Sequence, residues 1–253
     1  MEGAYETQIV EISRQDDLCC LCREESKRAD NMDSIQVVVV ASPFSNLASV
    51  YEVDPDADVL LIVLPSTAPV APTNKPHVNG FKPTAHAASP ASPRGLRIKV
   101  SSKHLALASP IFKNKLQVGS SRATKQSDGR IHLQLVEGFD PAAVTIVMNA
   151  VHGRGSKIPK SVDIETLAQI ALFVDRFQLF DAVEVYADRW IWKLEDATPH
   201  TYGEDLVRWV YISHIFRHAT VFKTVTEITA IHSPGPIDTF GLPIREKIIS
   251  KTA

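Results

Sequence analysis

Short apolar runs with a two-residue period mark the strands of this chain. Residues 96–100 alternate between apolar and basic side chains, which is the pattern of a strand with one buried face. Residues 131–135 alternate between apolar and polar side chains in the same way. Residues 58–64 are apolar on both faces after the first position, which favours a central strand. The pattern therefore predicts a small sheet built from these three strands.

The period changes directly after residue 100, where Ser101 or Ser102 can cap a first helical turn. Apolar residues then recur at spacings of three and four as far as Phe112, which gives a helix one apolar face. Ser109 followed by Pro110 restarts the helix, because serine can cap a helix and proline loses no hydrogen bond at the first helical position. We expect the strand to lead into two short helices that are turned relative to each other.

Later apolar stripes with the same spacing predict further helices. Asp140-Pro141 repeats the combination of cap and proline, and Gly153 suits the left-handed residue that ends a helix. The stripes within 167–174 and 183–194 lie on either side of a short connection, which predicts an antiparallel helix pair. We expect a flanking set of helices from about 101 to 194.

A helical extension is predicted for residues 196–253. Pro199 interrupts the preceding pattern, and Thr201-x-x-Glu204 has the form of a capping box. The helix that follows is apolar on more than one side, which indicates that it is buried. The whole pattern, with strands first and mostly helices afterwards, is typical of an α+β fold.

Two stretches lack sustained periodicity. Residues 1–50 are mostly polar, and we expect a tail with one β-branched run at 35–40 that suits an edge strand. Residues 65–95 hold seven of the sixteen prolines. Such a segment buries too little apolar surface to offset the entropy lost on ordering. We therefore expect a disordered, dispensable insertion inside a domain that spans 51–195.

Charge and composition narrow the classes of partner. The net charge is −2, so no overall positive field draws the chain to nucleic acid or to acidic lipid. No apolar run approaches the ~20 residues that span a bilayer, and the first residues lack the pattern of a secretory signal. The sequence thus predicts an intracellular protein, cytoplasmic or nuclear, with neither membrane nor direct nucleic-acid contact.

The sequence contains few motifs that indicate catalysis or the binding of a cofactor or metal. It lacks a glycine-rich phosphate loop, a nucleophile motif and an H-E-x-x-H pair. Cys19, Cys20 and Cys22 fall in one tetrapeptide, and structural zinc normally needs four ligands, so we expect reduced thiols, with a redox or metal role left open. His152 is expected to be a structural helix end rather than a catalytic base. We predict no catalytic, cofactor-binding or metal-ligating residues, and no enzyme.

One stretch resembles a known family. V-S-S-K-H-L-A-L-A-S-P-I-F, at 100–112, resembles the signature of the BTB/POZ domain, in which a strand feeds a helix that ends in a Ser-Pro-x-Phe-like corner. Residues 58–63, 149–154 and 174–177 are similar to an opening strand and later helices of the divergent BTB-like proteins of filamentous fungi. The resemblance covers roughly 50–195. It implies a BTB/POZ-like small sheet flanked by α-helices, followed by the helical extension.

The resemblance also implies a function. BTB domains are non-catalytic protein-interaction modules, so it implies an adaptor or scaffold that acts as a homodimer or with other protein partners. A subunit of a ubiquitin-ligase or transcriptional complex is the alternative. Residues 117–130 contain no glutamate, although cullin-binding adaptors carry a hydrophobic-x-Glu motif there. The chain also lacks zinc-finger spacing or a basic helix for DNA. An enzyme of unrecognised type is the least favoured class.

Four residues are candidates for the interface. Val38 lies in the β-branched run, which the family often exchanges between subunits and which could instead lie along the chain's own sheet. In many BTB domains an aspartate at the position of Asp58 helps to form a charged pocket with a basic residue early in the first helix. Here Ser102 stands at that basic position, with Lys103 beside it. Leu105 follows in a region that the family buries between subunits.

Overall fold

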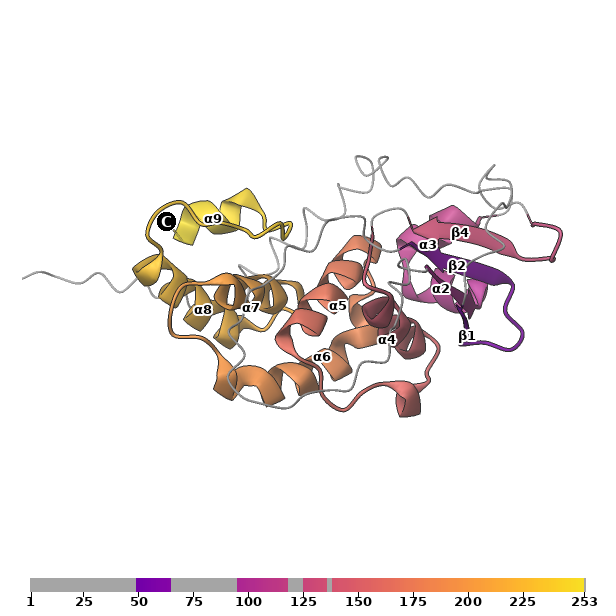
Figure 1. Ribbon diagram of the computed structural model, residues 1–253, viewed down its shortest axis with the longest axis horizontal. Coiled ribbons are helices and arrows are strands. Elements are labelled where there is room, and N and C mark those ends of the chain that lie inside the picture. The colour runs from indigo at the N-terminus through magenta and orange to yellow at the C-terminus, as the bar shows by residue number, and fades with distance from the viewer. Residues whose placement is uncertain (1–48, 65–94, 118–124, 136–137, 253) are drawn as a thin grey trace, which may run out of the picture. The chain divides into compact units, whose positions relative to one another are not determined.

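The computed structural model describes residues 49–64, 95–117, 125–135 and 138–252, which belong to one compact unit (Figure 1). Their fold is α+β, as predicted, with a four-stranded mixed sheet and eight helices in these ranges. The run at 35–40, the three cysteines and residues 65–94 of the insertion lie outside the described residues. In these ranges no helix has both the length and the apolar character needed to cross a membrane.

The sheet has the strand order β1-β3-β2-β4. Strand β2 is antiparallel to β3 and parallel to β4, while β1 is parallel to β3. Strands β2, β3 and β4 confirm the three predicted strands, with each end within one residue of its predicted position. Strand β1 was not predicted and begins inside the expected tail. The bounds are β1 Ser49–Glu52, β2 Val59–Val63, β3 Leu96–Val100 and β4 Ile131–Leu135.

The most deeply buried positions of three strands meet on one face of this sheet. Leu61 of β2 stands opposite Ile98 of β3 and Leu133 of β4, and all three side chains are buried. Because side chains alternate between the faces of a strand, this register brings the apolar positions of three strands together. All five residues of β2 are buried, which agrees with its apolar pattern on both faces.

Helices α2 to α6 follow the predicted order, and Figure 1 shows α2 and α3 beside the sheet. Both proline starts are confirmed: the Ser109 hydroxyl accepts a hydrogen bond from the Phe112 N–H (3.1 Å), and the Asp140 carboxylate accepts one from the Ala143 N–H (2.7 Å). The bounds are α2 Ser102–Ala108, α3 Pro110–Leu116, α4 Pro141–Val151, α5 Ile164–Phe177 and α6 Phe180–Leu194.

The predicted extension is helical and packs on the rest of the unit. Helix α7 contacts α5, and its Trp209 and Tyr211 side chains are buried. The prediction of a capping box at Thr201 and Glu204 is wrong. The cap position of α7 is Gly203, which has no side chain to cap the helix, and the Glu204 carboxylate pairs with Arg208 one turn later. The bounds are α7 Glu204–Ile215, α8 Ala219–His232 and α9 Glu246–Thr252.

Candidate interaction surface

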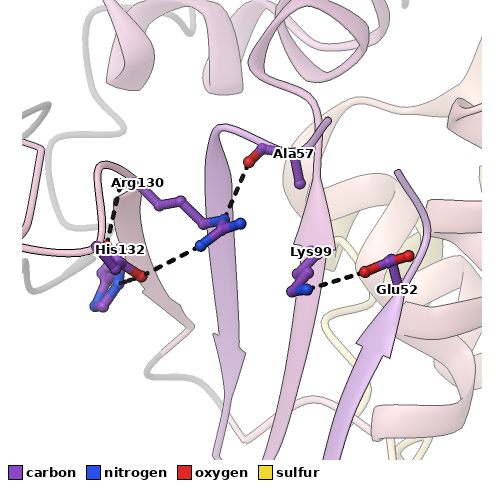
Figure 2. A network of polar contacts seen from close by, with 6 residues as sticks. Glu52, Ala57, Lys99, Arg130 and His132 are labelled. Carbon is purple, nitrogen blue, oxygen red and sulfur yellow. Dashed lines mark hydrogen bonds and ion pairs between the residues drawn. The ribbon is translucent and has the colours of Figure 1, made fainter. Parts of the chain in front are cut away.

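Strand β1 forms one edge of the sheet, and side chains hold it there. The Asn149 amide of α4 donates a hydrogen bond to the Tyr51 hydroxyl (3.3 Å). The Arg154 guanidinium donates to the backbone carbonyl of Glu52 (3.1 Å), and the Glu52 carboxylate pairs with Lys99 Nζ of β3 at 2.9 Å (Figure 2). A strand of only four residues is thereby fastened to both the sheet and α4.

The two edges of the sheet differ. At β4, a bridge between Lys125 and Ile131 adds backbone pairing, and Arg130 Nε donates to the Ala57 carbonyl at 3.1 Å (Figure 2). The turn before β4 therefore folds back along that edge. On the outer side of β1, by contrast, no strand pairs with it among the described residues. Strand β1 thus presents the more open edge in the described part of the chain.

Apolar side chains are exposed on β1 and on α2. Val50 of β1 has 54% of its surface exposed, and Leu107 of α2 has 89%. Neither residue was a predicted interface position, because Val50 falls in the expected tail and Leu107 in a stretch that predicts only a helix. Only the fold shows which positions remain open to a partner.

The four predicted interface residues differ in how far the structure exposes them. Leu105 is fully buried in the core (0% exposed), so its side chain is not available at the surface and we drop it from the candidate surface. Lys103 is exposed at the start of α2. Asp58 is half-buried just before β2, and Val38 lies outside the described residues.

Asp58 fixes the corner where β3 becomes α2. One carboxylate oxygen accepts from the Ser102 N–H (2.7 Å) and the other from the Ser102 hydroxyl (2.6 Å). Asp58 therefore does meet the residue at the family's basic position, but through hydrogen bonds to a neutral serine. Ser101, one of the two serines expected to cap this helix, stands at the cap position but makes no side-chain cap bond. Burial acts to raise the pKa of Asp58, but the bonds from Ser102 outweigh it and the pKa lies below its usual value.

We expect Asp58→Asn to destabilise the domain by about 2 kcal/mol near neutral pH, because hydrogen bonds to charged groups contribute about that much. A carboxylate whose folded pKa is depressed stabilises the fold above its unfolded pKa of ~3.9, and that contribution is lost as the pH falls through the folded pKa. The gap in unfolding free energy between wild type and variant should therefore shrink in acid. Urea titrations across this range measure it.

Asp56→Asn is the matched control for this experiment, because Asp56 is an exposed residue in the same turn. It should leave the unfolding free energy nearly unchanged near neutral pH. A gap for Asp58→Asn that stays constant from neutral to strongly acid pH would contradict the assigned role of the carboxylate.

His152 ends α4 and reaches the same corner. Its Nδ1 lies 2.8 Å from the Met148 carbonyl oxygen and therefore donates, while its Nε2 accepts from the Ser101 N–H at 3.0 Å. Only a neutral ring can make both bonds. Burial lowers the pKa of His152, and the nearby His104 lowers it further, although the bond to Met148 acts to raise it. The helix-end role of His152 is confirmed.

Three potential metal ligands meet beside this corner. The His104 ring of α2 stacks on the His152 ring, with centroids 4.8 Å apart. One ligand atom from each of these histidines and from Asp54 all lie within 4.8 Å of one another. Sequence reasoning missed this group, because about fifty positions separate each residue from the next and no short motif joins them.

Comparison with known proteins gives no match: no family model matches the chain, and no curated protein sequence matches it. Its function has to be inferred from the fold and from the residues that the fold brings to the surface.

Proposed function

We propose that this chain is an intracellular, non-catalytic interaction module of the BTB/POZ-like type, which binds protein partners and a second copy of itself through the β1 edge and the first helices. The observation that carries the proposal is the open β1 edge, with exposed Val50 on the same strand and exposed Leu107 on α2. The order of two strands, two short helices, a strand and further helices from β2 onward supports the BTB/POZ-like assignment.

A sheet edge is a natural docking element. Its outward N–H and C=O groups are free to pair with another strand, and an extended segment that adds there gains main-chain hydrogen bonds. A strand that adds at this edge would also cover exposed apolar surface of Val50 and remove it from water.

The β-branched run at 35–40 is the segment of this chain that best suits such an edge. Eight residues separate it from Ser49, the first residue of β1. A linker of that length extends at most ~29 Å. Within this reach the run at 35–40 can pair either with β1 of its own chain or with β1 of a second copy. We favour the second copy, because the resemblance to BTB domains implies a dimer.

Charged substitutions on the surface test this proposal. Val50→Lys should weaken self-association roughly tenfold or more, since lysine on an edge strand opposes strand pairing and loss of a central, fully desolvated interface contact can cost ~2 kcal/mol or more. Leu107→Lys should act in the same direction. Sedimentation equilibrium over a concentration series gives the dissociation constants.

Ile231→Lys is the matched control, because Ile231 of α8 is another exposed apolar residue. All three variants should remain folded, since the replaced side chains are exposed on the single chain. Wild-type association in both Val50→Lys and Leu107→Lys would show that this surface is not the one used. An equally large effect of Ile231→Lys would point to general loss of association through added charge.

A further inference from the structure

The group formed by Asp54, His104 and His152 joins three separate parts of the fold. Asp54 lies in the turn between β1 and β2, His104 in the first turn of α2, and His152 at the end of α4. Two imidazoles and one carboxylate are a donor set that suits borderline transition-metal ions such as Zn²⁺, Co²⁺ and Ni²⁺, and suits Mg²⁺ or Ca²⁺ poorly. Three such ligands leave a coordination position for water.

His152 is already oriented as metal-ligating histidines usually are. Its Nδ1–H donates to the Met148 carbonyl oxygen, which fixes the tautomer and leaves Nε2 with a lone pair. In the structure this lone pair accepts from the Ser101 N–H at 3.0 Å, so an ion has to replace that hydrogen bond. Binding is therefore coupled to the corner between β3 and α2.

The other two ligands are free to adjust. His104 is exposed and makes a ring contact with His152, and one oxygen of Asp54 accepts from the Asp56 N–H while its second oxygen has no hydrogen-bond partner among the described residues. Ligand atoms around a tetrahedral Zn²⁺ lie roughly 3.3 Å apart, given metal–ligand distances near 2.0 Å. Contraction from 4.8 Å therefore needs movements of up to ~1.5 Å, shared by the exposed His104 side chain and the Asp54 carboxylate.

We propose that Asp54, His104 and His152 bind a divalent transition-metal ion of the zinc class, which links the turn before β2, the start of α2 and the end of α4. An ion held there binds the folded chain only, because the three residues are far apart in the sequence. It therefore raises the stability of the corner that carries α2.

The test uses the full-length chain with Cys19→Ser, Cys20→Ser and Cys22→Ser, because free thiols also bind zinc. Zinc chloride at about 100-fold above its dissociation constant should raise the unfolding temperature by roughly 5–10 °C. Co²⁺ should give visible absorption bands on binding. His104→Ala should abolish both effects without unfolding the chain, since this ring is exposed.

His132→Ala is the matched control, because His132 has Asp128 beside it (3.0 Å) but belongs to no group of three possible ligands among the described residues. This variant should keep the thermal shift and the Co²⁺ bands. The proposal is overturned if His104→Ala retains the zinc-dependent shift, which indicates binding elsewhere on the surface. It is equally overturned if the cysteine-free chain shows no shift at millimolar zinc.

Discussion

Replacing Phe112 by alanine is expected to destabilise the domain by about 3–5 kcal/mol, the usual cost of removing a buried aromatic ring. The Phe112 ring is buried and stacks almost parallel on Phe177, with centroids 4.6 Å apart and 4° between the planes. Phe139 and Phe173 pack against Phe177 in turn. The cavity would therefore open beside Phe177, the ring that all other members of this aromatic cluster contact, and would weaken the junction of α3 and α5.

The loss is measured as the change in unfolding free energy in urea or, if the variant is insoluble, as the loss of soluble folded protein. Phe240→Ala is the matched control, because the same change is made at an exposed ring, and it should cost well under 1 kcal/mol. Wild-type stability of Phe112→Ala would refute the core assignment.

Trp190→Ala should cost a similar ~3–5 kcal/mol. The indole is 1% exposed, and its Nε1–H donates to the Pro159 carbonyl oxygen at 2.9 Å. The variant loses packing beneath α6 and also leaves that carbonyl without its partner. Trp190→Phe should fall between alanine and wild type, because it keeps much of the ring but not the hydrogen bond.

Trp192 supplies the control within the same helix. It lies two positions further along α6 and is 72% exposed, so Trp192→Ala should leave the unfolding free energy nearly unchanged. Equal losses of unfolding free energy in Trp190→Ala and Trp192→Ala would contradict the orientation of α6, in which Trp190 faces the core and Trp192 faces solvent.

The elements that the sequence predicts well are those with local signals. Strands β2, β3 and β4 were found from apolar patterns, and α3 and α4 from a cap followed by proline. Strand β1 was missed because it has four residues and owes its place to pairing with β3, more than forty positions away. Non-local pairing of this kind leaves no period in the sequence.

The corner between β3 and α2 shows the same limit at the level of single residues. The local pattern assigned the cap to a serine, whereas the carboxylate that satisfies the Ser102 N–H comes from Asp58, 44 positions earlier. Leu105 has the spacing of an apolar face, but that spacing alone could not decide whether the face meets the chain's own core or a partner. The source of the cap and the burial of Leu105 both depend on packing between segments that are distant in the sequence.

The mass of the unmodified chain in solution tests the central proposal most directly. At tens of micromolar we predict a species of twice 27.9 kDa, the mass of two copies. Removal of residues 1–48, which stops just before β1, should shift the population toward one copy by taking away the run at 35–40. A full-length chain that sediments strictly as a 27.9 kDa monomer at that concentration would contradict self-association.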